Sequence, residues 1–175
     1  MADRLAWGSG SVTVLDALGR LSLRGGPAAL AAAGDAFGVV LPDQACRAVE
    51  GEARAALWLG PDEQLLLVQR SEWADVLAAL SAALQPTPHS LVDISQRQVA
   101  VQVSGDDAAL LLNAGCPLDL HPQAFPVGMC TRTVFAKAPI VLWRTDEDTF
   151  HLEVWRSFAR YVMQLLAEVS REPVE

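Results

Sequence analysis

Residues 140–166, with the sequence IVLWRTDEDTFHLEVWRSFARYVMQLL, contain the two hydrophobic patterns that decide the fold. Hydrophobic and polar residues alternate over 150–154, which is the period-two pattern of a half-buried strand. The short polar residues of 145–148 favour a tight turn before it. From Trp155 onward the hydrophobic residues recur along one face of a helix. We therefore predict a strand, an acidic turn, a second strand and an amphipathic helix.

The same pattern occurs earlier in the chain. Residues 57–84 match residues 142–169 without a gap, at a separation of 85 positions, so that Trp58 falls on Trp143. The match includes the polar turn and the hydrophobic face of the helix. These two features are stronger evidence for a duplicated unit than the few identical residues. We interpret the two stretches as copies of one folding unit.

A second match lies upstream of the first. Residues 21–30 match residues 101–110 at a separation of 80, and both copies read as a strand, a glycine and a short helix. The two separations predict five extra residues in the second copy. Two prolines within 85–89 interrupt both helix and strand. We therefore predict one domain of two structural halves, about 11–85 and 90–172, with this proline-containing connection between them.

The expected elements mix strands and helices in an order that identifies the fold class. Successive strands lie too close in the sequence for repeated helical crossovers, which favours α+β over a doubly wound parallel sheet. We predict an α+β fold in which a unit of antiparallel strands and helices is duplicated with pseudo-two-fold symmetry. Residues 1–10 are expected to form a loose arm, because Gly8 and Gly10 disfavour a strand.

Composition excludes several classes of protein. A hydrophobic content of 51% over 175 residues predicts a folded core. No hydrophobic run approaches the roughly 20 residues of a membrane span, and the N-terminus lacks a secretory signal pattern. The net charge of −8 without a basic cluster argues against nucleic acid as a partner. Three cysteines without a CxxC spacing suit the reducing cytoplasm.

The sequence contains few residues in patterns typical of a metal-binding or catalytic site. Cys116, His121 and Cys130 have the spacing C-x4-H-x8-C, which fits no standard zinc pattern and lacks a fourth ligand. We expect the cysteines to be small buried residues. The acidic run at 146–148 lacks the spacing of a calcium loop, and no glycine-rich phosphate-binding loop is present. We therefore predict neither a metal site nor a catalytic residue on this chain.

Asp119 is a candidate of a different kind. It lies between Leu118 and Leu120 within the irregular segment 115–128, which contains three prolines. An acid among hydrophobic neighbours is a candidate functional group. It could equally cap a turn or pair with an arginine, and that structural role is the favoured one.

Tryptophan is abundant for a chain of this composition. Five tryptophans with one tyrosine suggest that some indoles become buried only against a partner. The candidates for core or interface anchors are Trp7, Trp58, Trp143 and Trp155. Together with the lack of a convincing active site, this favours a binding or structural subunit over an autonomous enzyme.

Several segments of the second half carry a resemblance to a known family. They are LVDISQRQ (91–98), GCPLDLHPQAFPVG (115–128), TRT (131–133), IVLWR (140–144) and TFHLEVWRSFARYV (149–162). In this order they resemble the gamma subunit of heterotetrameric sarcosine oxidase. LWLGPDEQLLL (57–67) extends the resemblance into the first half.

The resemblance implies a small, non-catalytic scaffold subunit of a bacterial, cytoplasmic oxidoreductase complex. Such a complex oxidatively demethylates sarcosine to glycine, in sarcosine catabolism and one-carbon metabolism. The resemblance places FAD, FMN and NAD on the alpha and beta subunits, zinc on delta, and tetrahydrofolate on the alpha subunit. The gamma subunit packs against that folate-binding part of alpha and binds no cofactor by itself.

The same resemblance has implications for the fold and for Asp119. It implies a fold similar to the folate-binding domain of the glycine-cleavage T-protein, an aminomethyltransferase built from a duplicated α+β unit. The order D-L-H-P followed by F-P-V-G, within 119–128, is similar to the T-protein stretch that carries its folate-contacting acid. Asp119 is therefore the cofactor-binding candidate of this chain.

Two alternatives to the scaffold subunit remain open. One is a stand-alone folate-binding protein of aminomethyltransferase type, which would transfer one-carbon groups with the help of Asp119. The other is a gamma subunit of a related N-methyl amino acid dehydrogenase complex. Because the substrate would then bind to another subunit, the sequence of this chain does not separate that alternative from sarcosine oxidase.

Overall fold

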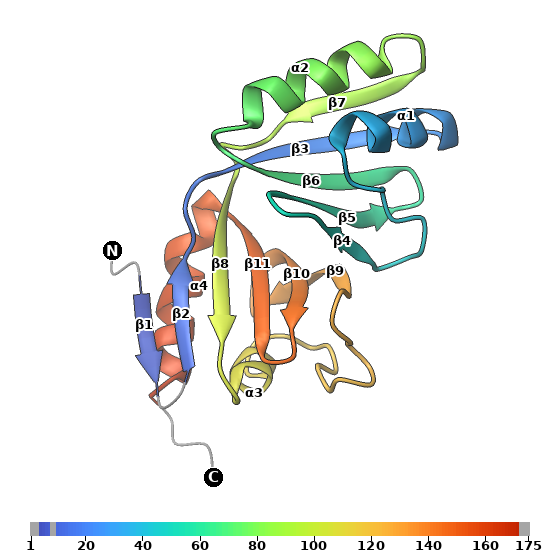
Figure 1. The fold of residues 1–175 in the computed structure, drawn as a ribbon. Coiled ribbons are helices and arrows are strands. Elements are labelled where there is room, and N and C mark those ends of the chain that lie inside the picture. Colours follow the sequence, from blue (N-terminus) through green and yellow to red (C-terminus); the bar gives the residue numbers. More distant parts are fainter. Residues whose placement is uncertain (1–3, 8–9, 172–175) are drawn as a thin grey trace. The chain divides into compact units, whose positions relative to one another are not determined.

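A computed structural model describes residues 4–7 and 10–171 of the chain (Figure 1). The chain forms two compact units. Residues 17–95 make up one of them, which we call the middle unit, and the other consists of 1–16 and 96–175, which we call the flanking unit. Within the described residues, none of the helices is long and hydrophobic enough to cross a membrane.

The middle unit is a five-stranded antiparallel sheet with two helices. Its elements are β3 (Leu18–Gly25), α1 (Pro27–Phe37), β4 (Ala48–Glu50), β5 (Arg54–Gly60), β6 (Glu63–Gln69), α2 (Trp73–Leu84) and β7 (His89–Asp93). The sheet order is β4-β5-β6-β3-β7. Without the edge strand β4, this order and the chain sequence βαββαβ are those of a ferredoxin-like unit.

The flanking unit repeats this arrangement. Its elements are β1 (Arg4–Trp7), β2 (Gly10–Val14), β8 (Gln98–Ser104), α3 (Ala108–Asn113), β9 (Cys130–Phe135), β10 (Ala138–Asp146), β11 (Thr149–Trp155) and α4 (Arg156–Val169). The sheet order is β1-β2-β8-β11-β10-β9, in which β2 lies beside β8 as β7 lies beside β3. The predicted α+β fold with a duplicated antiparallel unit is thus confirmed.

Each copy takes one strand from a part of the chain that the sequence comparison assigned to the other half. β2 precedes the middle unit in the chain but pairs with β8, with Val12 opposite Val103. β7 precedes β8 directly but pairs with β3, with Leu91 opposite Leu23. Residues 4–7 form β1 and Gly10 begins β2, and the two strands pair with each other. The expectation of a loose arm is therefore wrong for these residues. That the two units form one domain stays a prediction.

Strand pairing corrects the register of the sequence match by one residue. In the middle unit Leu21 lies opposite Leu66, and in the flanking unit Val101 lies opposite Leu152. Since Leu21 corresponds to Val101 at a separation of 80, Leu66 corresponds to Leu152 at a separation of 86. The gapless match at 85 therefore assigned every residue of this hairpin to the wrong face of the sheet, because side chains alternate between faces.

The two hydrophobic cores agree with a separation of 86. The hydrophobic core of the middle unit includes side chains from one sheet face and from both helices: Leu21, Leu23, Ala29, Ala33, Phe37, Ala56, Leu66, Val68, Val76, Leu80 and Leu84. The core of the flanking unit includes Val101, Val103, Leu112, Leu142, Phe150, Leu152, Val154, Val162, Met163 and Leu166. The pairs Ala56 and Leu142, Val76 and Val162, and Leu80 and Leu166 all follow this separation.

β11 differs from the half-buried strand that its alternating pattern predicts. Its five inner residues, 150–154, are all buried. His151 and Glu153 share the face opposite the helices, and His151 Nε2 lies 2.8 Å from Glu153 Oε1. Two polar side chains that bond to each other lose less on burial than isolated ones. The alternation therefore predicted the helix-covered face correctly but not the burial of the other face.

Gly19 of β3 provides a direct test of packing in the middle unit. A Cβ atom at this position would overlap the indole of Trp73 and lie 2.7 Å from Val68 Cγ1. We expect Gly19→Ala to lower the free energy of unfolding by about 1–3 kcal/mol, because the tightly packed side chains must shift. Urea denaturation would measure the change. The matched control is Gly26→Ala, where a Cβ meets nothing within 4 Å; equal stability of the two variants would contradict this packing.

Candidate functional site

The segment that carries the family resemblance, residues 115–128, is held in place by Arg144 of β10. This side chain is only 3% exposed. Its Nη1 donates to the carbonyl oxygens of Leu120 and Phe125, at 3.1 and 2.9 Å. Its Nε donates to Glu147 O at 3.0 Å, and Nη2 donates to the same oxygen. Arg144 therefore ties the irregular segment to the turn between β10 and β11.

Asp119 lies on the exposed side of this segment. Its Oδ1 accepts a hydrogen bond from the backbone N–H of His121 at 2.9 Å, and His121 Nδ1 accepts one from Gln123 N at 3.3 Å. Nearby, Asn113 Nδ2 donates to Leu118 O at 2.6 Å. The carboxylate of Asp119 thus stabilises a turn, which is the favoured structural role. Its role as a folate contact stays a prediction.

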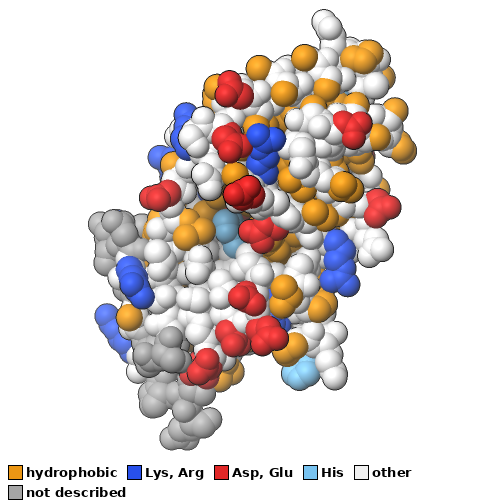
Figure 2. Space-filling model, viewed as in Figure 1, with side chains coloured by type: hydrophobic (Ala, Val, Ile, Leu, Met, Phe, Trp, Pro, Cys, Tyr) orange, Lys and Arg blue, Asp and Glu red, His pale blue; other side chains and the backbone are white. Residues whose placement is uncertain are grey.

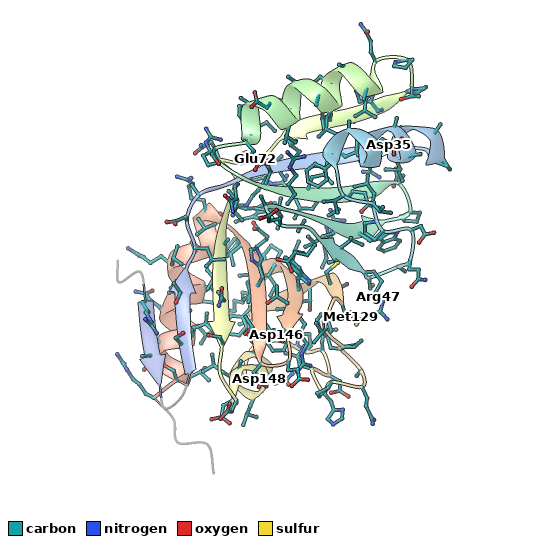
Figure 3. All side chains as sticks on the ribbon, in the orientation of Figure 1. Asp35, Arg47, Glu72, Met129, Asp146 and Asp148 are labelled. Atoms are coloured by element: carbon teal, nitrogen blue, oxygen red, sulfur yellow. The ribbon has the colours of Figure 1, made fainter. Side chains whose placement is uncertain are left out.

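The other candidate groups are dispersed. Cys116 and Cys130 are buried, whereas His121 is exposed. The described residues contain no group of three or more His, Cys, Asp or Glu side chains arranged to hold a metal ion. Asp146 and Asp148 lie at the exposed turn between β10 and β11 (Figure 3).

The tryptophans named as anchors differ in their exposure. Trp143 is buried, Trp58 is half-buried, and Trp155 is 43% exposed with the Arg97 guanidinium 5.4 Å from its ring centre. The side chain of Trp7 lies outside the described residues. Trp58 and Trp155 therefore have indole surface available to a partner, whereas Trp143 does not.

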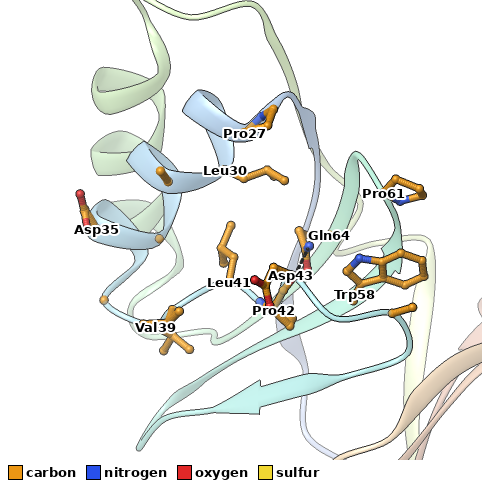
Figure 4. A pocket seen from close by; sticks show the side chains of 15 residues that line it. Pro27, Leu30, Asp35, Val39, Leu41, Pro42, Asp43, Trp58, Pro61 and Gln64 are labelled. Atoms are coloured by element: carbon orange, nitrogen blue, oxygen red, sulfur yellow. Dashed lines mark hydrogen bonds between the residues drawn. The ribbon is translucent and has the colours of Figure 1, made fainter.

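A pocket of about 790 Å³ lies within the middle unit, on the helix-covered face of its sheet. It is bounded by α1, by the loop 38–45 and by the ends of β5 and β6 (Figure 4). Its walls are mainly hydrophobic, from Pro27, Leu30, Leu41, Trp58 and Pro61. The polar side chains that line it are Asp35, Asp43 and Gln64. A hydrophobic cavity with a few polar groups is typical of a binding site.

Gln64 is the buried polar side chain of this pocket. It is 1% exposed and faces Trp58 across the β5–β6 hairpin. Its Nε2 donates to Pro42 O at 2.9 Å, which fixes the orientation of the amide. Among the described residues, no donor reaches its Oε1. This oxygen is itself buried, so Gln64 shapes the wall of the pocket and does not present an open acceptor to it.

Arg54 fixes the α1 wall of the pocket. Its Nη1 donates to the carbonyl of Phe37 at the C-terminus of α1, at 2.6 Å, and its Nη2 lies 2.8 Å from Glu72 Oε2. The helix then ends at Gly38, whose φ of +74° is readily adopted by glycine. The pocket wall is thus held by a backbone cap and an ion pair.

The sequence pattern of the whole chain decides the family. The model of the sarcosine oxidase, gamma subunit family matches residues 24–172. The chain belongs to this family. The gamma-subunit resemblance of the segments quoted above is thereby confirmed, and the match also extends through most of the middle unit.

Individual relatives agree with this assignment. The gamma subunit of sarcosine oxidase from Corynebacterium sp. strain P-1 is 40% identical over 157 residues, which cover 86% of this chain and 74% of that protein. A solved heterotetrameric sarcosine oxidase from Corynebacterium sp. U-96, in complex with pyrrole 2-carboxylate, contains a chain 31% identical to this gamma-family chain, with a TM-score of 0.90 over 98% of this chain and 89% of that one.

The fold of this gamma-family chain also occurs in an aminomethyltransferase. Aminomethyltransferase T of the glycine cleavage system from Bartonella henselae matches 94% of this chain and 47% of its own length, with a TM-score of 0.70 and 13% identity. This likeness confirms the predicted aminomethyltransferase-like fold. It concerns the fold alone and assigns no folate contact to Asp119.

Sequence reasoning missed two features of this gamma-family chain. Arg144 was quoted within the motif IVLWR without a role, and the pocket beside α1 was not foreseen. Both features could have been found from the register of the strands, which determines the face of the sheet that each side chain occupies. Arg144 and Gln64 are polar residues at positions where the alternation places a core-facing side chain, which requires a buried hydrogen-bond partner.

Proposed function

We propose that this chain is the non-catalytic gamma subunit of a heterotetrameric sarcosine oxidase. In this role it is a scaffold that docks on the folate-binding part of the alpha subunit, while FAD, FMN, NAD, zinc and tetrahydrofolate are bound by other subunits. The carrying observation is the likeness to a chain of the solved heterotetrameric enzyme, with a TM-score of 0.90 over 98% of this chain. We expect the protein in the cytoplasm, whose reducing conditions suit a chain with three cysteines and no CxxC spacing.

The use of charged side chains supports a scaffold role. The guanidinium of Arg144 bonds to three backbone carbonyls, and Arg54 caps α1. The carboxylate of Asp119 accepts a backbone N–H. These groups hold loops and helix ends in place, so the expected contribution of the chain to catalysis runs through assembly.

Co-expression with the alpha, beta and delta subunits of a heterotetrameric sarcosine oxidase tests this proposal. We expect a complex of the four chains in equal amounts by size-exclusion chromatography with light scattering, and sarcosine oxidation that requires all four. A chain that never associates with a flavoprotein would contradict the proposal. Oxidation of another N-methyl amino acid in preference to sarcosine would support the related dehydrogenase complex.

A control addresses the stand-alone folate-binding alternative. The isolated chain would be titrated with tetrahydrofolate, and a ligand that binds the folded state raises the melting temperature by mass action. The scaffold proposal expects no change. A rise that disappears in Asp119→Asn would favour the aminomethyltransferase alternative.

A further inference from the structure

The pocket of the middle unit has a filled counterpart in the flanking unit. At a separation of 86, Trp58 and Gln64 correspond to Arg144 and Phe150, and both pairs face each other across a hairpin. In the flanking unit the side chain of Phe125, 1% exposed, lies against this position, with its ring centre 6.4 Å from that of Phe150. One copy of the unit thus contains an aromatic side chain where the other has an open pocket.

The difference comes from the connection between helix and hairpin. The two copies correspond at a separation of 80 before this connection and 86 after it, so the flanking unit has six more residues there. Its longer segment delivers Phe125 and presents two carbonyls to Arg144. In the middle unit the shorter segment presents Pro42 O to Gln64 but supplies no side chain equivalent to Phe125. The pocket is therefore a receptor for a side chain that this copy lacks.

The polar groups define the chemistry of the occupant. Gln64 Oε1 has almost no accessible surface, so this side chain does not present an acceptor to an occupant of the pocket. The charged residues that line the pocket, Asp35 and Asp43, are both acidic and both exposed. The occupant therefore combines a hydrophobic body and a positive charge.

The surface around the opening favours a protein segment over a small molecule. Val40 and Pro61 both line the pocket, and both are exposed, Val40 to 78%. Hydrophobic side chains reach the surface over this unit in Figure 2. A hydrophobic surface that continues beyond a pocket is typical of a protein interface. Since the filled counterpart holds a peptide segment, the same kind of occupant fits here.

We infer that the pocket receives an extended segment of a partner subunit. This segment inserts one hydrophobic side chain as Phe125 does and places a lysine or arginine against Asp35 and Asp43. The inference rests on the proposed function, because it requires that the chain assembles with other subunits. It adds the surface that binds and the chemistry of the segment that is bound.

Binding of this chain to the complex of the other three subunits tests the inference. Ala31 is an exposed residue of α1 that lines the pocket, and Ala31→Trp fills it. We expect the Kd to rise at least tenfold, roughly the effect of losing a well-packed anchor. The matched control is Ala79→Trp, at an exposed position of α2 that does not line the pocket, for which we expect a Kd within twofold of the native value.

Charge reversal tests the polar part of the inference. The double variant Asp35→Lys with Asp43→Lys should raise the Kd at least tenfold at low salt, and the difference from the native chain should shrink at high salt. Glu50→Lys is the control, because Glu50 is exposed and does not line the pocket. Melting temperatures of the isolated variants, within a few degrees of the native value, establish that they are folded.

The outcomes separate this inference from the proposed function. If the native chain binds and the pocket variants bind equally well, the pocket inference is wrong and the scaffold role stands. If the native chain binds none of the subunits, both are wrong.

With p-benzoylphenylalanine in place of Val40, irradiation should cross-link a partner segment that contains a lysine or arginine beside a hydrophobic residue. A cross-linked segment without a basic residue would overturn the inference.

Discussion

Arg144→Ala is expected to lower the free energy of unfolding by roughly 3–5 kcal/mol. The guanidinium is 3% exposed and donates to the carbonyls of Leu120, Phe125 and Glu147. Alanine leaves these carbonyls without their donor and removes the cation that lies 5.0 Å from the ring centre of Phe150. Urea denaturation followed by circular dichroism would measure the loss.

Hydrogen exchange would show where this loss arises. We expect faster exchange in the segment 115–128 of Arg144→Ala, because that segment is tied to the β10–β11 turn by Arg144. The strand β8 should retain its protection at low denaturant. Local opening of this kind distinguishes the loss of a loop anchor from general destabilisation of the unit.

Two further arginine variants serve as controls for this prediction. Arg144→Lys keeps the positive charge but cannot reproduce the planar set of donors, so we expect it to be destabilised as well, by less than the alanine variant. Arg156→Ala removes an exposed guanidinium that bonds to Gln96, and its effect should stay within about 1 kcal/mol. An Arg144→Ala protein as stable as Arg156→Ala would refute the role assigned to Arg144.

The duplication could be predicted from sequence because it depends on periodicity. The change from period two to period 3.6 within 140–166 recurs in the first copy, and each change marks a hairpin followed by a helix. Strand exchange could not be predicted in the same way. β2 and β7 are paired by their place in three dimensions, and a comparison of one stretch with another contains no information on which sheet a strand joins.

The one-residue error in the match has a physical origin. The match at a separation of 85 aligned Trp58 with Trp143, but a large aromatic residue is found on either face of a sheet. Trp143 corresponds to Leu57, and the position equivalent to Trp58 is occupied by Arg144. Hydrophobic residues on both faces of β6 weaken the alternation that would have fixed the register of the first copy.

The candidate site was predicted only where a motif marked it. Asp119 was found through its motif, and its place in an exposed turn agrees with the structural role. The pocket beside α1 exists because the loop 38–45 has no residue equivalent to Phe125 of the flanking unit. Such a difference becomes visible only when the two copies are aligned by strand pairing, since the sequence match gave an insertion of five residues in place of six.

Leu166→Ala is expected to cost about 2–5 kcal/mol, because Leu166 is fully buried in the core of the flanking unit. Its neighbour Leu165 is partly buried at the edge of that core, so Leu165→Ala should cost about 1 kcal/mol. The sequence match at 85 paired Leu80 with Leu165, whereas strand pairing gives Leu166.

Leu80→Ala completes this comparison within the middle unit. Leu80 is also fully buried, so its alanine variant should lose stability on the scale of Leu166→Ala and well beyond that of Leu165→Ala. Urea denaturation of the three variants ranks them. If Leu165→Ala were instead the more damaging of the two α4 variants, α4 would present a different face to its sheet, and the separation of 86 would not extend to the helices. The correspondence of Phe125 with the open pocket would then lose its basis, since it depends on the same separation.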